Sequence, residues 1–272
     1  MSKMQGIDVS IYQGAIDWTK VKAAGIDFAI VRAGYGRDFP GQDDPNFQAN
    51  VAGAQAAGLH VGAYHYSYAK TPEMAADEAA FCLRLIRGLK LDMPVYFDIE
   101  DPKQKNLGKA LITEIAKAFC SVVEAAGYYA GIYANLDWLN NRLDMSKLPY
   151  TVWLAQWASK PTYKGKFDMW QYTSDGSVDG IKGRVDRNEC YVDFPGIIRE
   201  KGLNGVSKEV IGQEGSPVAR LRCQCGDLLN AVPCKNVNGT MYIPARLAFE
   251  TYGYNVEWDG KNIDISPVKK EA

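Results

Sequence analysis

In Met93-Pro-Val-Tyr-Phe-Asp98-Ile-Glu100-Asp101-Pro102, a hydrophobic strand ends in two carboxylates that stand two positions apart. In a strand, that spacing places Asp98 and Glu100 on one face, with Cα atoms about 6.6 Å apart. Two carboxylates this close cannot both ionise freely, so we expect one pKa to be raised. Solvated acids are also common at strand ends. The pair by itself therefore has two interpretations, a catalytic site and an ordinary strand end.

Other strand-like runs before and after this segment predict the fold. Short runs rich in Val, Ile, Tyr and Phe occupy 4–9, 28–33, 60–66, 95–99, 128–133, 151–157, 167–172 and 184–186. Helical patterns fall between the earlier runs, at 18–25, 44–57, 74–89 and 107–126. Strands alternating with helices predict a parallel sheet, and eight strands suggest a closed barrel. After Tyr133 the spacers become too short for full helices. We therefore predict an α/β fold, an irregular TIM-like β/α barrel with missing helices.

Two more acids stand at strand ends. Asp8 ends the first predicted strand, and Asp186 lies near the end of the last. Because the first and last strands of a closed barrel are neighbours, both acids should approach Asp98 and Glu100 at the rim where barrel active sites are built. A single Asp is often a cap or turn residue, but four acids at strand ends favour an active site. Glycoside hydrolysis is one chemistry that needs such a group, with one protonated and one ionised carboxyl.

Aromatic residues crowd the same strand ends. Tyr64, Tyr133, Trp153 and Trp157 are the candidate substrate-binding residues, because flat apolar rings beside acids suit sugar faces. Each ring can equally well fill the barrel interior. Trp157 lies furthest along its strand and is the better candidate for the mouth of the barrel. His65 alternates with Tyr64 and should face the outer helical layer, which predicts a structural role.

The order of several motifs resembles a known family. These motifs are Gly6-Ile-Asp8-Val-Ser10-x-x-Gln13, Val31-Arg-Ala-Gly-Tyr35-Gly, Gly62-x-Tyr64-His65-Tyr66, Asp98-Ile-Glu100, Ile132-Tyr133-x-Asn135, Trp153-x-Ala155-x-Trp157, Trp170-Gln171-Tyr172 and Val185-Asp186-x-Asn188. Over about 4–195, the set resembles glycoside hydrolase family 25, the Chalaropsis-type lysozymes of phage endolysins and bacterial autolysins. The resemblance implies an irregular barrel that cleaves the β-1,4 bond between N-acetylmuramic acid and N-acetylglucosamine in bacterial peptidoglycan. No cofactor and no metal are predicted.

The resemblance also implies roles for the acids. Glu100 would be the general acid, and Asp98 would orient the 2-acetamido group of the substrate as it attacks the anomeric carbon. Asp8 and Asp186 would hold the charge and hydrogen-bond geometry of the site. Backbone spacing does not separate retention from inversion. The alternatives are a non-catalytic glycan-binding protein and a glycosidase for another N-acetylated polysaccharide such as chitin. A bacterial chitinase strand, however, would need acids at Met93 and Tyr96.

Charge and hydropathy exclude several functions and suggest a location. The formal net charge of -1 does not supply the field needed for non-specific nucleic-acid binding. No apolar run approaches the roughly 20 residues that span a bilayer, so stable membrane insertion is not expected. The first residues lack the apolar core of a secretory signal. We therefore expect synthesis in the host bacterial cytoplasm, and action on the cell wall after release by a phage lysis system.

Turn signals divide the chain into a catalytic barrel at 1–196, a glycine-marked linker at 197–216 and a small α+β module at 217–272. The module has hairpin patterns with Asn-Gly and Asp-Gly turns and a helical pattern at 244–252. It resembles the domain named after the N-terminal part of copper amine oxidases, although it contains no histidine. Wall targeting is the preferred role and self-association the second. Its cysteines, Cys223, Cys225 and Cys234, lack the usual zinc-site spacing and are interpreted as free or partly paired.

Overall fold

The computed structural model describes residues 3–206 and the backbone of six strands between 218 and 267. The chain forms two compact units, Met1–Glu209 and Val210–Ala272. In the described residues, no helix combines the length and the apolar character needed to cross a bilayer.

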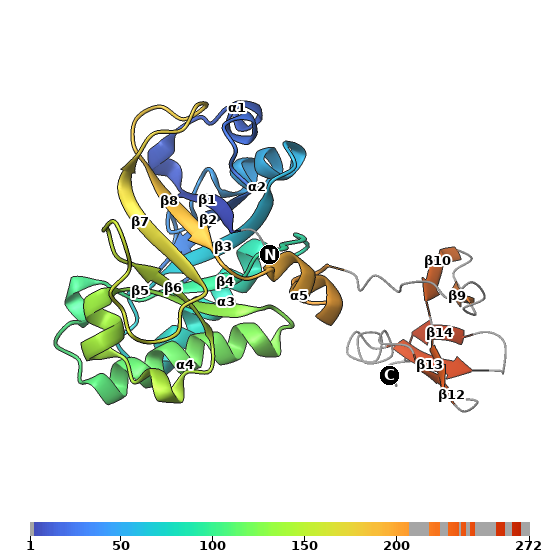
Figure 1. Ribbon diagram of the computed structural model, residues 1–272. Helices are drawn as coiled ribbons and strands as arrows, with labels where there is room; N and C mark the ends of the chain where they lie inside the picture. The colour runs from blue at the N-terminus through green and yellow to red at the C-terminus, as the bar shows by residue number, and fades with distance from the viewer. Residues whose placement is uncertain are drawn as a thin grey trace. The chain divides into compact units, whose positions relative to one another are not determined.

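The first unit is a closed barrel of eight strands, β1 to β8, in chain order (Figure 1). The strands are β1 (Met4–Val9), β2 (Phe28–Tyr35), β3 (His60–Tyr66), β4 (Val95–Asp98), β5 (Ala130–Asn135), β6 (Thr151–Ala155), β7 (Met169–Gly176) and β8 (Val185–Cys190). The helices are α1 (Trp18–Ala23), α2 (Phe47–Ala56), α3 (Pro72–Ile86), α4 (Lys109–Ala125) and α5 (Phe194–Lys201). Short 3-10 or π turns occupy Ile11–Gln13, Pro102–Gln104, Trp138–Arg142 and Met145–Lys147. Across 126–193, all of which is described, no α-helix occurs, which confirms the prediction of missing helices.

Strand β8 corrects the prediction of a wholly parallel sheet. It runs antiparallel to both β7 and β1, whereas the pairs from β1 to β7 are parallel. A parallel crossover needs a dozen or more residues, and the connection from Gly176 to Val185 is too short to provide one. Asp186 therefore lies at the beginning of its strand and not near the end.

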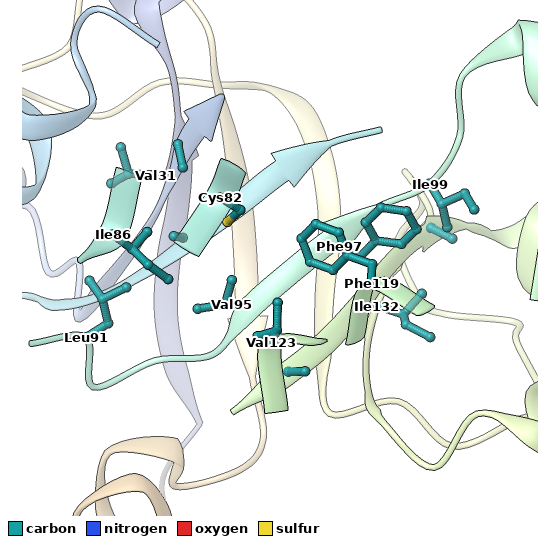
Figure 2. Close-up of a cluster of buried hydrophobic side chains, with 14 of the residues drawn as sticks. Val31, Cys82, Ile86, Leu91, Val95, Phe97, Ile99, Phe119, Val123 and Ile132 are labelled. Carbon is teal, nitrogen blue, oxygen red and sulfur yellow. The ribbon is translucent and has the colours of Figure 1, made fainter. Parts of the chain in front are cut away.

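Alternation along the strands separates two apolar layers. On β4, Val95, Phe97 and the following Ile99 face outward, where they pack against α3 and α4 (Figure 2). The ring of Phe97 stacks on Phe119 of α4 with centroids 4.3 Å apart. Tyr96 belongs instead to the smaller cluster inside the barrel. The strand therefore directs Asp98, two positions after Tyr96, toward the barrel axis.

His65 has the structural role that alternation predicts. Its ring is fully buried in the outer layer, where it contacts Phe81 of α3 and Phe119 of α4. Its Nε2 lies 2.7 Å from the carbonyl oxygen of Gly36. Burial lowers the pKa of His65 to about 4. The imidazole is therefore neutral at physiological pH and lies apart from the acids at the rim.

The end of the barrel opposite Asp98 is closed by residues that lie beyond 196, the predicted end of the catalytic domain. That boundary falls inside helix α5, and the fully buried Asn204 follows the helix. The Asn204 amide donates to the carbonyl of Met93 at 2.8 Å and accepts from the backbone N–H of Tyr129 at 2.6 Å. Asn204 adopts φ 55°, a left-handed conformation that asparagine tolerates better than most residues. Residues 197–206 are therefore part of the barrel unit.

The second unit contains two small sheets. The first has the strand order β10-β9-β14-β13, and the second pairs β11 with β12. The strands are β9 (Val218–Cys223), β10 (Leu228–Pro233), β11 (Lys235–Val237), β12 (Thr240–Tyr242), β13 (Tyr254–Trp258) and β14 (Ile263–Pro267). Antiparallel pairing of β11 with β12 and of β13 with β14 confirms both predicted hairpins. The predicted helix at 244–252 and the side chains of the three cysteines lie outside the described residues.

Candidate active site

Four acids gather at the rim formed by the carboxyl ends of β1 and β4. Asp8 is the penultimate residue of β1, Asp98 ends β4, and Glu100 follows two positions later. Asp186 stands directly opposite Asp8 in the β1–β8 register. The antiparallel direction of β8 therefore brings the start of this strand to the rim where β1 ends. The predicted grouping holds, although the predicted strand direction does not.

Two amides hold Asp8 inside the barrel. Its Oδ2 accepts hydrogen bonds from Nδ2 of Asn188 at 2.7 Å and from Nε2 of Gln171 at 3.0 Å. Burial and, after it, the charge of Asp186 raise the pKa of Asp8 to about 8, although the two amides oppose the rise. Burial also raises the pKa of Asp186 to about 6. Both acids thus titrate well above their ordinary range.

Asp98 is the acid with an unused acceptor. Burial raises its pKa well above the usual range, the charges of Glu100 and Asp8 add to the rise, and the Arg32 guanidinium opposes it. Its Oδ1 is buried and has no hydrogen-bond partner among the described residues. A buried carboxyl oxygen without a donor is costly. This atom is therefore prepared to accept a hydrogen bond from a bound molecule.

Glu100 is in a different environment. It is half-buried, and its Oε2 accepts a hydrogen bond from Nδ2 of Asn135 at 3.0 Å. Burial raises the pKa of Glu100 and the charge of Asp186 adds to the rise, while the Asn135 hydrogen bond opposes it. A partly exposed carboxyl group with a raised pKa can meet a ligand and keep its proton closer to neutral pH. These are the properties of a general acid.

The structure separates the predicted aromatic residues into different roles. The Trp157 indole is 65% exposed, and its Nε1 donates to Oε1 of Gln171 at 3.1 Å. The Tyr133 hydroxyl donates to the same oxygen at 3.1 Å. Tyr64 is half-buried and packs edge-on against Trp153 with centroids 6.2 Å apart. Of these aromatic side chains, Trp157 offers the most open ring face for a sugar.

The predicted role of Trp153 needs correction. Its side chain is 1% exposed and packs against Tyr133 and Tyr96 inside the barrel, so no open face remains for a sugar. Its Nε1 donates to Oδ1 of Asn188 at 2.8 Å, and Asn188 in turn donates to Asp8. Trp153 therefore supports the site indirectly, through its hydrogen bond to Asn188. The Tyr96 ring has room here because residue 131 is glycine: a Cβ atom at Gly131 would lie only 2.5 Å from the ring.

Four polar residues of the site were absent from the sequence-based prediction. They are Arg32, Asn135, Gln171 and Asn188. The signal that points to them is strand alternation: Asn188 lies two positions after Asp186, and Asn135 lies two after Tyr133. The Arg32 guanidinium pairs with Asp44 at 2.9 Å and lies over the Tyr12 ring, 5.1 Å from its centroid.

Residues 7–181 match the family described as glycosyl hydrolases family 25. The chain belongs to this family. The match includes Asp8, Asp98 and Glu100 but ends before Asp186 and Asn188. These last two residues reach the site because β8 pairs with β1 and closes the barrel. In the described residues no cluster of metal-ligand type occurs.

This family 25 chain is similar to an autolytic lysozyme and to the solved structures of an autolysin and an endolysin. An autolytic lysozyme of Clostridium acetobutylicum is 29% identical over 189 residues, covering 68% of this chain and 55% of that protein. A modular autolysin of Streptococcus pneumoniae, solved with a synthetic peptidoglycan ligand, is 28% identical with a TM-score of 0.62, covering 70% of this chain and 47% of that one. The CTP1L endolysin is 29% identical with a TM-score of 0.64, covering 73% and 70%. The chain thus spans about half the length of the two autolytic proteins.

Proposed function

We propose that this family 25 protein is an N-acetylmuramidase, a lysozyme that hydrolyses the β-1,4 bond between N-acetylmuramic acid and N-acetylglucosamine in peptidoglycan. The observation that carries the proposal is the group of four acids with raised pKa values at one rim of the barrel. The autolytic lysozyme and the autolysin bound to a peptidoglycan ligand support this choice of substrate.

In the proposed reaction, Glu100 gives its proton to the leaving glycosidic oxygen as the glycosidic bond breaks. The acetamido N–H of the substrate donates to Oδ1 of Asp98, the buried acceptor that has no partner among the described residues. The acetamido oxygen then bonds to the anomeric carbon and gives a cyclic, positively charged intermediate. Water attacks that carbon while Glu100, now ionised, takes a water proton, which restores the acid and retains the configuration.

The remaining residues assist this sequence. Asp186, whose pKa of about 6 leaves it largely ionised at neutral pH, supplies negative charge that favours the positive charge developing at the anomeric centre. Asp8, whose pKa is about 8, keeps its proton at that pH and maintains the hydrogen-bond geometry of the site. Asn188 and Gln171 hold Asp8 in place through their hydrogen bonds. The exposed Trp157 ring is proposed to stack on a sugar face, as an apolar surface beside a polar site.

The test measures release of reducing ends from purified cell walls by wild type and Glu100→Gln. We expect activity to fall by about 10²–10⁴-fold in Glu100→Gln, because proton donation is lost while the shape is kept. Glu114→Gln, an exposed change on α4, is the matched control and should retain activity. Full activity in Glu100→Gln would contradict the assignment. Wild type that binds walls without cleaving them would indicate a glycan-binding protein, and products without a muramic-acid reducing end would indicate another glycosidase.

We further propose that the protein is a phage endolysin, made in the bacterial cytoplasm and acting on the wall after release. Its likeness to the CTP1L endolysin supports this role. Fractionation of producing cells tests it: the protein should remain with the cytoplasmic fraction until the membrane is permeabilised. Protein found on the wall of intact cells would contradict it.

For the second unit we propose wall targeting by a module similar to the N-terminal domain of copper amine oxidases. The antiparallel hairpins at β11–β12 and β13–β14 support a separate folded module. A chain ending at Glu209 should cleave soluble fragments normally and bind whole cells less well. Equal cell binding would remove the targeting role, and a change in sedimentation on truncation would favour self-association.

A further inference from the structure

A buried amide lies behind the turn that bears Glu100. Gln104 is 1% exposed and sits in the short 3-10 turn that follows Asp101. Its Oε1 accepts a hydrogen bond from the backbone N–H of Asp101 at 3.2 Å. Its Nε2 donates to the carbonyl of Ala69 at 2.7 Å and to Oγ of Ser67 at 3.3 Å. Both ends of the amide are therefore used, and they join the turn after β4 to the loop after β3.

That loop is held from its other side as well. The backbone N–H of Ser67 donates to the carbonyl of Asp98 at 2.9 Å. The fully buried Glu78 of α3 accepts from the backbone N–H of Tyr68 at 2.9 Å. The loop at 67–69 is thus a fixed support between α3 and β4, and Gln104 transmits that support to Asp101.

The residue after Glu100 receives a second restraint from the same loop region. Oδ2 of Asp101 accepts a hydrogen bond from the Tyr66 hydroxyl of β3 at 3.3 Å. The side chain of Asp101 is thus tied directly to β3, whereas its backbone N–H is tied to the loop after β3 only through Gln104. Glu100 lies between Asp98, fixed at the end of β4, and Asp101. Its direction therefore depends on where Asp101 is held.

We infer that Gln104 is a positioning residue for Glu100: its buried amide fixes the turn at 99–101 and so aims the proposed general acid at the scissile bond. Gln104 does not touch the ligand space and acts through Asp101. This inference rests on the proposed function. Because rates depend steeply on sub-ångström placement, with a 1 Å error able to cost 10²-fold, loss of the amide should reduce kcat more than it changes KM.

The experiment compares Gln104→Met with Gln48→Met in the full-length protein, using soluble peptidoglycan fragments. Gln48 of α2 donates Nε2 to the carbonyl of Leu85 at 3.0 Å, so its replacement also removes an amide-to-backbone hydrogen bond, but away from the rim. We expect kcat to fall about 10–100-fold in Gln104→Met with KM within about threefold of wild type. Gln48→Met should keep wild-type kcat. Circular dichroism at the assay temperature shows whether each variant is folded.

Ser67→Ala is the milder second variant. It removes the hydroxyl oxygen that accepts from Gln104 Nε2 and from the backbone N–H of Ala69, so the support behind Asp101 is weakened and kcat should fall about 3–10-fold even if Gln104→Met does not fold. Wild-type kcat in a folded Gln104→Met, or in Ser67→Ala where Gln104→Met is unfolded, would overturn the inference. An equal loss in Gln48→Met would overturn it too. If wild type itself releases no reducing ends, the proposed function fails instead, and the two failures are thereby distinguished.

Discussion

Replacing Asn135 with alanine is expected to move the basic limb of the pH–rate profile toward higher pH. The Asn135 amide donates to Oε2 of Glu100 at 3.0 Å and stabilises the ionised form of this carboxyl group, which opposes the rise in its pKa. Without the amide, the ionised form loses its donor and the pKa of Glu100 rises. The general acid then keeps its proton to a higher pH.

The size of the effect follows from the strength of one hydrogen bond to a charged group, about 1.5–3 kcal/mol. Since roughly 1.4 kcal/mol corresponds to a tenfold change in a protonation equilibrium, and Glu100 is partly solvated, the basic limb should move by about one pH unit. The variant also loses the hydrogen bond from the backbone N–H of Trp138 to Oδ1 of Asn135. This second loss lowers the overall rate but leaves the position of the limb unchanged.

The assay is kcat/KM on soluble peptidoglycan fragments between about pH 4 and pH 9, for wild type, Asn135→Ala and Asn141→Ala. Asn141 donates to Asp137 at 2.9 Å on the exposed surface, so it offers the same chemistry away from the site. Its profile should match that of wild type. A basic limb that stays in place or moves to lower pH in Asn135→Ala would refute the role of Glu100 as the acid that sets this limb.

Three other changes test the energetics of the barrel. Asn188→Ala leaves the Trp153 N–H without its acceptor and removes a donor from Asp8, so the free energy of unfolding should fall by about 2–4 kcal/mol in urea titrations; an unchanged midpoint would contradict this network. Asn204→Gly should lower Tm by about 4–16 °C, because the two hydrogen bonds of the Asn204 amide are lost. Asn204→Ala should lower Tm further, because alanine disfavours the left-handed backbone conformation of this position. Equal Tm values for the two variants would argue against backbone strain. The folded protein raises the pKa of Asp8 from its ordinary 3.8 to about 8, so the free energy of unfolding should decline as pH rises from about 4 to about 8. Asp8→Asn should flatten that decline, whereas the exposed control Asp77→Asn should leave it unchanged.

The faces of the strands were predictable from local spacing. Successive side chains in a strand point to opposite sides, so Asp98 and Tyr96 share the inner face while Phe97 and His65 lie in the outer layer. Turn residues marked both hairpins of the second unit, because Asn-Gly and Asp-Gly pairs tolerate the backbone angles of tight turns. Short spacers after Tyr133 showed where helices are missing. Each of these features depends on a few neighbouring residues.

The fold boundary and the support of the site depended on distant parts of the chain. The helix α5 and Asn204 belong to the barrel because the Asn204 side chain reaches Met93 and Tyr129. Trp153 is a supporting residue because packing inside the barrel covers its ring. Neither result follows from the residues on either side of the position concerned, since burial is set by which elements meet.

By itself, the sequence identified the candidate catalytic residues, four acids within motifs that resemble family 25, and predicted that they lie at strand ends. Tertiary structure decided how they meet. The antiparallel course of β8 places Asp186 opposite Asp8, and closure of the barrel brings Asp8 to Gln171 and Asn188, which lie 163 and 180 residues away in the chain. The physical reason is that a period of two fixes the face of a strand locally, whereas its direction, its neighbours and its buried hydrogen-bond partners are settled only when the whole barrel closes.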